Sequence, residues 1–553
     1  MTQLPIPKNE AQWRSHEDAV RQAEAIVDEI CNISGTPGLA VGIFNLEGQS
    51  EMSFHGFRDV EKGLPPDLET IFNIGSLCKA FTAVAVACLV EDGKVSWDDR
   101  IDTHLHHLRG RDNGAFTLRD LLSHRSGLCR SDALFIGSDN RLLITKSQGL
   151  EIFASLDPSS PPRQDFLYNN FGYHALGCVI EHVSGTGFGE FMKKRIFKPL
   201  DMSRTFTKLP PKDDENTSLA YMPYYNRQPR AVPSPQISSD TVAFAAGSIR
   251  SCARDLVRFY RFLLRGLKPG FQELGLCSDH VATIFEAVIP LHGSPRTLRE
   301  RSYAMGWART QLPNNINLVN GNAGLLDDWP VIGSFHNGML VLHHTGNNLG
   351  CSSTIFLLPE IDTGVIALGN ALGHCDAADW AAQILLEALL ERTIKTPFTQ
   401  YAKTAASNGR SAMDRVQKAL DAEKEPSQLP SDLEQYTGIF RHKTEIFYLE
   451  IKLDTSKYKE SLSVKFQGQD EEKYKLRHYH YDTFVFNETF DQVVRRGQWC
   501  RPYSFYKIEF IVEGNNVNSL RWRFDDTEAE GHIFKRETTH QGYGRIHNLC
   551  VPC

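Results

Sequence analysis

The feature that most constrains the fold is a strand pattern that occurs in two groups, far apart along the chain. Residues 39–44 are a short apolar run and residues 50–56 follow a glycine-containing turn, so together they predict a β-hairpin. Strand-like apolar runs return late, at residues 339–342, 353–358 and 364–368. If the early and late strands share one antiparallel sheet, everything between them belongs to a single domain.

Helical patterns surround these strands. Helix-favouring composition covers residues 11–34 and 376–392, and apolar helical segments alternate with Gly- and Pro-rich connections between the two groups of strands. With 41% hydrophobic residues, the chain can fill a sizeable core. The pattern predicts an α+β domain over residues 1–395, in which helices flank an antiparallel sheet.

The last part of the chain has a different pattern. A polar stretch at residues 396–430 predicts a linker with some helix in it. Short period-two segments follow, such as 447–452 and 506–510, and polar turns separate them. This spacing is typical of a small antiparallel β-barrel. We therefore expect a second domain, with a tail, over residues 431–553.

Charge and composition exclude some classes of function. The chain has 67 acidic and 60 basic residues and a net charge of -7, so nucleic acid is not an expected partner. The most apolar run, residues 80–90, is about half the roughly 20 residues that a membrane span needs. No secretory signal pattern begins the sequence, and the 12 cysteines are scattered. These features predict a cytoplasmic protein without a membrane span.

The first candidate for catalytic chemistry is a serine followed by a lysine three residues later. Ser76 and Lys79 precede a helical run at residues 80–87, and i to i+3 spacing places both on one helix face. A lysine in an apolar pocket can become neutral and accept the serine proton. The alternative is an ordinary helix start, with Ser76 as an N-cap and Lys79 in solvent. This four-residue pattern is common by chance.

The second candidate lies in a loop before a predicted helix at residues 173–183. Tyr168 could relay a proton between Ser76 and the leaving group, and Asn170 could hydrogen-bond Lys79 and the substrate. The alternative is an asparagine-rich surface turn.

The third candidate is the segment His344-Thr345-Gly346-Asn347, which reads as the end of a strand and its turn. Glycine at a strand edge allows close approach, so the N–H of Asn347 could join that of Ser76 as an oxyanion hole. The alternatives are an ordinary strand-end histidine or, because two histidines are adjacent, a metal ligand. No second set of ligands at metal spacing accompanies them.

Together and in this order, the three motifs resemble the S-x-x-K, Y-x-N and K/H-x-G set of the serine β-lactamase-like and penicillin-binding-protein-like superfamily. The resemblance is closest to its branch of class C β-lactamases, esterases, D-aminopeptidases and acyltransferases. It covers roughly residues 20–395 and includes the stretches 116–128, 246–256 and 305–307. It implies a β-lactamase/transpeptidase-like fold with a helical subdomain, followed by a lipocalin-like barrel.

The resemblance also implies roles for the motif residues. Ser76 would form the acyl-enzyme, Lys79 and Tyr168 would share acid and base duties, and Asn170 would position the substrate. His344, Thr345, Gly346 and Asn347 would line the oxyanion side. No metal or organic cofactor is implied.

Three functions follow from this site. The first is a serine hydrolase that cleaves a small-molecule or peptide-like ester or amide, and the second is an acyltransferase that acts on a small molecule, such as a secondary metabolite. The third is a catalytically silent binding module on the same fold. His344 stands where many β-lactamases of this branch have a lysine that recognises the antibiotic's carboxylate, so ester, amide or acyl-transfer chemistry is favoured. The oligomeric state is not predicted.

Overall fold

The first domain is built on one eight-stranded antiparallel sheet. The computed structural model describes residues 10–293, 297–456, 459–514 and 516–537, so the end of the region 431–553 predicted as a barrel domain with a tail lies outside the described residues. In the sheet, β1 pairs with both β2 and β14, which confirms that early and late strands share one sheet. The strands in spatial order are β2 (Ser50–Gly56), β1 (Gly38–Asn45), β14 (Thr363–Gly369), β13 (Cys351–Leu358), β12 (Leu340–Asn348), β11 (Ala308–Gln311), β10 (Arg301–Tyr303) and β9 (Ile289–Pro290).

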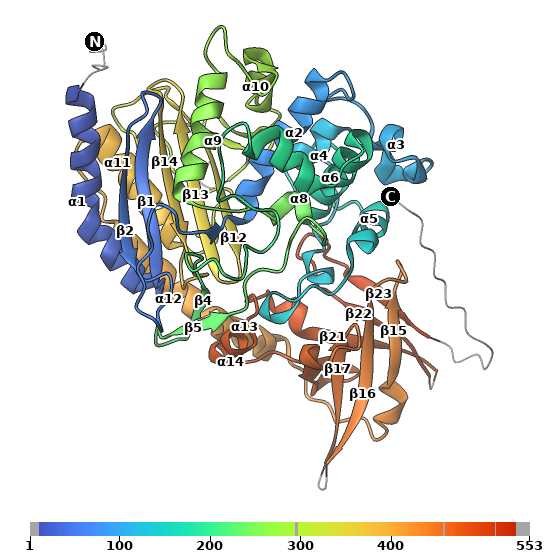
Figure 1. Cartoon of the computed structure of the whole chain (residues 1–553). Coiled ribbons are helices and arrows are strands. Elements are labelled where there is room, and N and C mark those ends of the chain that lie inside the picture. Colours follow the sequence, from blue (N-terminus) through green and yellow to red (C-terminus); the bar gives the residue numbers. More distant parts are fainter. Residues whose placement is uncertain (1–9, 294–296, 457–458, 515, 538–553) are drawn as a thin grey trace.

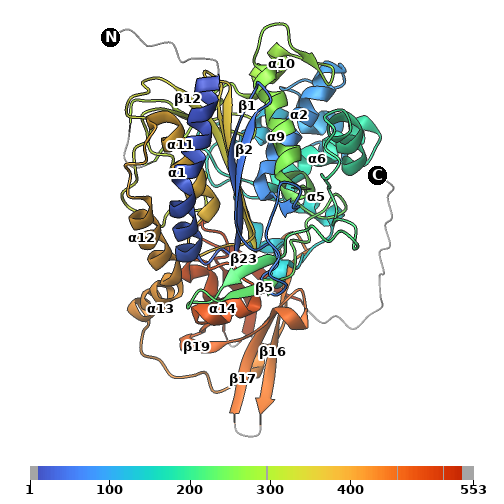
Figure 2. The same ribbon diagram turned by 60° about the vertical axis from the view of Figure 1, so that its left-hand side comes forward.

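Long helices cover one face of this sheet. α1 (Glu10–Ser34) and α11 (Ala377–Glu391) lie side by side against it (Figures 1 and 2). Their apolar residues, such as Val27 and Trp380, share a core with Val365 of the sheet, because each helix places apolar residues on its inward face.

The opposite face carries the helical subdomain. α2 is apolar almost all round and is buried at the centre of this layer, as expected for a helix surrounded by protein. The helices on this side are α2 (Cys78–Glu91), α3 (Ile101–His104), α4 (Leu118–Leu122), α5 (Lys146–Ala154), α6 (Asn170–Ser184), α7 (Phe188–Met192), α8 (Phe244–Gly247), α9 (Ala253–Gly266) and α10 (Ser278–Ile284). Three short two-stranded pairs accompany them: β3 (Phe72–Asn73) with β6 (Arg250–Ser251), β4 (Ala220–Pro223) with β5 (Pro229–Val232), and β7 (Gln272–Glu273) with β8 (Leu276–Cys277).

The stretch that the sequence suggests is a linker begins with two packed helices. α12 (Phe398–Arg410) buries Phe398 and Ala402 in the core that α1 and α11 form. α13 (Ala412–Glu423) instead buries residues such as Leu420 against the second domain. The alanine-rich face of α12 is what lets it pack closely, and the change of partner occurs at Ser411, between the two helices.

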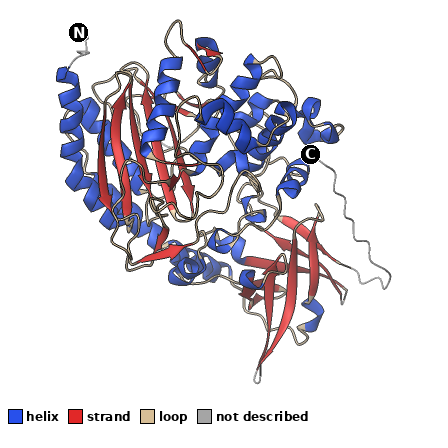
Figure 3. Ribbon diagram, viewed as in Figure 1, coloured by secondary structure: helices blue, strands red, loops and turns tan. Residues whose placement is uncertain are grey.

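The second domain, called the barrel domain below, is a nine-stranded antiparallel sheet that curls into a nearly closed barrel (Figure 3). Its two edge strands follow one another in the chain with only Leu476 between them, so the sheet returns almost to its start. Aromatic residues such as Phe440, Trp522 and Phe534 fill the interior. The spatial order is β18 (Lys473–Lys475), β17 (Lys459–Phe466), β16 (Tyr448–Ser456), β15 (Gly438–His442), β23 (His532–Arg536), β22 (Asn516–Trp522), β21 (Lys507–Glu513), β20 (Thr483–Val485) and β19 (Arg477–His480), and α14 (Phe490–Arg496) precedes β21.

Within the described ranges, no helix is both long enough and apolar enough to cross a bilayer.

Candidate active site

Ser76 lies at the entrance of α2, between the sheet and the helical subdomain. The helical run predicted at residues 80–87 belongs to α2, which begins at Cys78, and a single 3₁₀ turn at Gly75–Leu77 precedes it. Lys79 belongs to the first turn of α2, and its Nζ lies 3.0 Å from Ser76 Oγ. The serine and lysine therefore do meet, as i to i+3 spacing predicts.

The environment of Lys79 is dry. The side chain is fully buried, and its Nζ donates to Asn170 Oδ1 at 3.0 Å and to the Ala246 carbonyl at 3.3 Å. Burial lowers the pKa of Lys79 from 10.5 to about 7, because removal from water disfavours the charged ammonium. A large share of the lysine is then neutral near pH 7 and able to accept a proton.

Tyr168 reaches the serine from the loop before α6. Its hydroxyl lies near enough to Ser76 for that side chain to act on its pKa. The Tyr168 ring packs against His124, with 4.1 Å between the ring centroids, and Lys79 Nζ lies 4.7 Å from the centroid of the Tyr168 ring. Burial raises the pKa of Tyr168 well above 10, so the phenol keeps its proton at neutral pH. The hydroxyl is therefore a proton donor rather than a phenolate base in the resting protein.

Asn170 is the first residue of α6 and has both ends of its amide occupied. Its Oδ1 accepts from Lys79, and its Nδ2 donates to the two carboxylate oxygens of Asp132 at 3.1 and 3.2 Å. Asn169 has a separate task as the N-cap, since its Oδ1 accepts from Gly172 N at 2.8 Å. The residue between Tyr168 and Asn170 is thus a helix cap.

The third motif lies inside a strand and not at its end, contrary to the sequence interpretation. β12 stays paired with β13 as far as Asn348, and the turn comes only at Leu349–Gly350. The continuing ladder with β13 keeps the segment extended. On its other side, β12 pairs with β11 only through Leu340 to His343, so its edge is open from His344 onward.

Two glycines bring this edge against the nucleophile. A Cβ on Gly346 would lie 2.8 Å from Ser76 N, and a Cβ on Gly75 would lie 2.9 Å from Asn347 N. Gly75 also has a φ of +50°, which side chains other than glycine rarely adopt. The backbone N–H groups of Ser76 and Asn347 are therefore neighbours, as an oxyanion hole requires.

His344 and Thr345 face different groups. His344 Nε2 lies 3.0 Å from the Tyr303 hydroxyl, and Nδ1 lies 2.6 Å from the Thr345 carbonyl. Thr345 Oγ1 donates to the Val319 carbonyl at 3.0 Å. Burial lowers the pKa of His344 to about 3, so the imidazole is neutral and offers a polar group rather than a cation. Among the described residues, His, Cys, Asp and Glu side chains do not gather in groups of three that could hold a metal ion.

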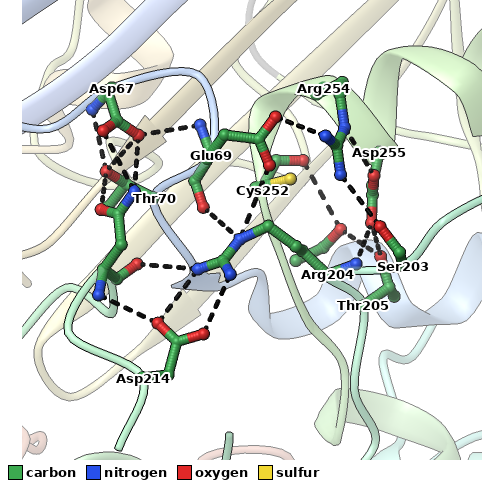
Figure 4. A network of polar contacts seen from close by, with 12 residues as sticks. Asp67, Glu69, Thr70, Ser203, Arg204, Thr205, Asp214, Cys252, Arg254 and Asp255 are labelled. Carbon is green, nitrogen blue, oxygen red and sulfur yellow. Dashed lines mark hydrogen bonds and ion pairs between the residues drawn. The ribbon is translucent and has the colours of Figure 1, made fainter.

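A polar network fixes the chain that leads into Ser76 (Figure 4). Arg204 donates from Nε to the Glu69 carbonyl at 2.8 Å, and the Arg204 backbone N donates to buried Asp255 at 2.7 Å. Arg254 pairs with Glu69 at 2.5 Å. These contacts join the loop before β3 to the start of α9, and the β3–β6 pair carries the chain directly to Gly75.

A cavity of about 410 Å³ opens over Ser76. It is lined by the predicted residues Ser76, Tyr168, Asn170, His344, Thr345 and Asn347 and by further residues that the motifs did not indicate. Four of these further residues are three charged side chains and one indole: Arg130, Asp132, Arg501 and Trp499. Because Trp499 and Arg501 belong to the barrel domain, both domains form the cavity. No local pattern marks these four residues in the sequence.

The barrel domain also holds the loop that carries Arg130 and Asp132. Asp525 accepts from the backbone N of Ser131 at 2.5 Å, and Ser131 has a φ of +52°, which is strained for a side-chain-bearing residue. Further along the same loop, buried Glu472 accepts from Ser138 N at 2.7 Å. The second domain thus fixes the loop whose Asp132 orients Asn170.

An eight-stranded antiparallel sheet, a helical subdomain and a serine–lysine pair at their junction define the β-lactamase/transpeptidase-like class of protein. A family model described as Beta-lactamase matches residues 23–403, and one described as a domain of unknown function (DUF3471) matches residues 422–535. The chain belongs to the Beta-lactamase family, which confirms the resemblance carried by the three motifs.

Known proteins agree with this placement. The chain is 24% identical over 427 residues to the human serine beta-lactamase-like protein LACTB, mitochondrial (63% of this chain, 74% of the relative), and 24% identical over 344 residues to a beta-lactamase of Escherichia coli K12 (60% and 84%). It is 26% identical over 314 residues to the unguisins hydrolase ungD' of Aspergillus campestris (55% and 53%).

Solved structures show the same fold. The octameric penicillin-binding protein homologue from Pyrococcus abyssi has a TM-score of 0.57 at 21% identity, with 93% of this chain and 100% of that chain covered. The class C beta lactamase from Rhodobacter sphaeroides has a TM-score of 0.53 at 22% identity, with 68% and 99% covered.

Proposed function

We propose that this chain is a serine hydrolase that cleaves an ester or amide through an acyl-enzyme on Ser76. The observation that carries the proposal is the buried Lys79 amine, 3.0 Å from Ser76 Oγ and with its pKa lowered to about 7. Such a lysine is matched to proton abstraction near neutral pH, where a general base is most effective.

In the proposed reaction, neutral Lys79 takes the Ser76 proton as Oγ attacks the substrate carbonyl. The N–H groups of Ser76 and Asn347 stabilise the oxyanion that forms. Tyr168 then donates its proton to the leaving group and regains one from Lys79, which frees the base for the second half of the reaction. A water attacks the ester carbonyl of the acyl-enzyme by the same steps in reverse and releases Ser76.

The natural acceptor of the acyl group decides between hydrolysis and transfer. The same residues would serve an acyltransferase, and no contact among the described residues favours an alcohol or amine acceptor over water. A relative described as an unguisins hydrolase and one described as a beta-lactamase support hydrolysis. A silent binding module would have no need of a dry lysine beside a serine. A cytoplasmic location stays a prediction.

Turnover of p-nitrophenyl acetate tests the proposal. We expect release of p-nitrophenol by the wild type, loss of that activity in Ser76→Ala, and full activity in the matched control Ser407→Ala, whose serine is exposed on α12. Product analysis with and without added alcohol or amine separates acetate from a transferred acetyl group. Equal turnover by Ser76→Ala and wild type would remove Ser76 from the mechanism.

A further inference from the structure

The segment between α14 and β21 carries two barrel-domain side chains into the active-site cavity. Trp499 packs with Val232 and Leu349, close to where β12 turns into β13, and lines the cavity. Arg501 follows two residues later. Its backbone N donates to the Tyr506 hydroxyl at 3.2 Å, and its guanidinium lies 5.7 Å from the ring centroid of Phe505. Packing on both sides therefore fixes this segment at the cavity wall.

The charges that face the cavity do not balance. Arg130 and Arg501 supply two permanent cations, and Asp132 supplies one carboxylate. Asp132 already accepts from the Asn170 amide, and Arg130 lies 3.7 Å from it. Within the described part of the chain, no carboxylate lies within ion-pair distance of the Arg501 guanidinium, and the guanidinium donates no hydrogen bond to protein; Asp132 and Asp526 attract it only from further away.

Holding a partly buried guanidinium at the cavity wall without an ion-pair partner costs free energy, and an anionic ligand would offset this cost. Arg501 is half-buried, and burial lowers its pKa, which reflects the loss of water around the cation. Arginine presents a planar fork of donors that matches a carboxylate in geometry and charge. His344 is neutral, so the strand motif supplies no cation to the cavity. An anionic substrate group therefore has its strongest partner at the arginines.

We propose that Arg501, assisted by Arg130, binds a free carboxylate of the substrate, so that the natural substrate is an ester or amide that also carries a carboxylate. This inference rests on the proposed serine hydrolase function and names its substrate class. The barrel domain then selects the substrate while the first domain supplies the chemistry. Arg501 is a binding residue and takes no part in proton transfer.

Two esters of equal size test the proposal. The p-nitrophenyl monoester of glutaric acid has a free carboxylate, and the p-nitrophenyl ester of glutaric acid monoamide has a neutral amide in its place. We expect kcat/KM of the wild type to be at least about tenfold higher for the carboxylate, as charge-assisted hydrogen bonds give. Arg501→Gln should bring the ratio of the two kcat/KM values, carboxylate ester over amide ester, close to 1. Arg501→Lys should keep part of the preference for the carboxylate ester.

A matched variant controls for net charge. Arg495→Gln removes an exposed arginine of α14, outside the cavity lining, and should leave the ratio of the wild type unchanged. As a second measurement, glutaric acid should slow labelling of Ser76 by a fluorophosphonate in the wild type and not in Arg501→Gln. This readout works even if neither ester is turned over quickly.

The outcomes separate the two proposals. If Ser76 is labelled and both esters are hydrolysed, yet the ratio is near 1 in the wild type or is kept in Arg501→Gln, the carboxylate inference is wrong and the hydrolase proposal stands. If Ser76→Ala hydrolyses both esters as fast as the wild type, the hydrolase proposal is wrong and the inference fails with it.

Discussion

The centre and the rim of the cavity are built in different ways. At the centre, Ser76, Lys79 and Asn170 come from one domain, and Lys79 is fully buried with its hydrogen bonds to Ser76, Asn170 and Ala246 at 3.0 to 3.3 Å. At the rim, Arg130 and Arg501 come from two domains, are half-buried, and leave one guanidinium without a carboxylate. The difference indicates that reactivity and substrate choice are separate properties, so substitutions at the centre should affect all substrates and substitutions at the rim only some.

We expect the largest loss of activity for Lys79→Met, a substitution at the centre of the cavity. This substitution removes the proposed base but keeps an apolar side chain of similar length in the buried pocket. We therefore expect kcat/KM to fall about 10²- to 10⁴-fold both for the glutarate ester with a free carboxylate and for the ester with a neutral amide. Lys94→Met, at an exposed lysine beyond α2, is the matched control and should be fully active. A rate within about threefold of the wild type for Lys79→Met would exclude this lysine as the base.

Tyr168→Phe should have the next largest effect. The ring stays packed against His124 while the proton donor is lost, so kcat should fall about 10²-fold for an alkyl ester or amide. The loss should be smaller for p-nitrophenyl esters, because nitrophenolate leaves without protonation. Tyr481→Phe, at an exposed tyrosine of the barrel domain, is the control. Equal losses for both kinds of leaving group would contradict the role of Tyr168 as acid.

The dependence of kcat/KM on pH should follow the ionisation of Lys79 at the centre and not the arginines at the rim. As the proposed base, Lys79 would act in its neutral form. Because its pKa is lowered to about 7, kcat/KM should fall about tenfold for each pH unit below 7 and level off above it. Arg501→Gln should shift the height of the profile for the carboxylate ester and leave its midpoint in place. A flat profile between pH 5.5 and 8 would contradict a lysine base with this pKa.

The smallest effect is expected at the contact that joins the two domains. Asp525→Asn weakens the acceptor for Ser131 N and so loosens the loop that carries Arg130 and Asp132. We expect kcat/KM for the carboxylate ester to fall about two- to tenfold, as loss of a hydrogen bond to a charged group does. Glu530→Gln, at an exposed glutamate of the barrel domain, should have no effect. If kcat/KM for the neutral ester fell equally, the contact between Asp525 and Ser131 would support the catalytic centre and not the selection of the carboxylate.

The same division explains how much the sequence predicted. The helix at residues 11–34 and the strands at 50–56 and 353–358 follow from local periodicity, and the structure has them at nearly these bounds. Ser76 and Lys79 meet because three-residue spacing across the 3₁₀ turn and the start of α2 fixes their distance. The order of the three motifs indicated the other candidate residues of the centre.

The rim could not be predicted because no local pattern encodes it. Arg501 reaches the cavity only because the barrel domain packs against the first domain, and Asp132 faces Asn170 because Asp525 holds the neighbouring Ser131 in a strained conformation. The position of His344 within β12 depended on pairing with β13, which a turn-like sequence does not reveal. Contacts between distant segments decided each of these cases.

Peptide mapping by mass spectrometry after treatment with a fluorophosphonate tests the central claim most directly. We predict one phosphonyl adduct on the peptide that contains Ser76, no adduct in Ser76→Ala, and labelling of the wild type that is slower at pH 5.5 than at pH 8. A folded wild-type protein that carries no adduct on Ser76, or carries it on another serine, would contradict the account.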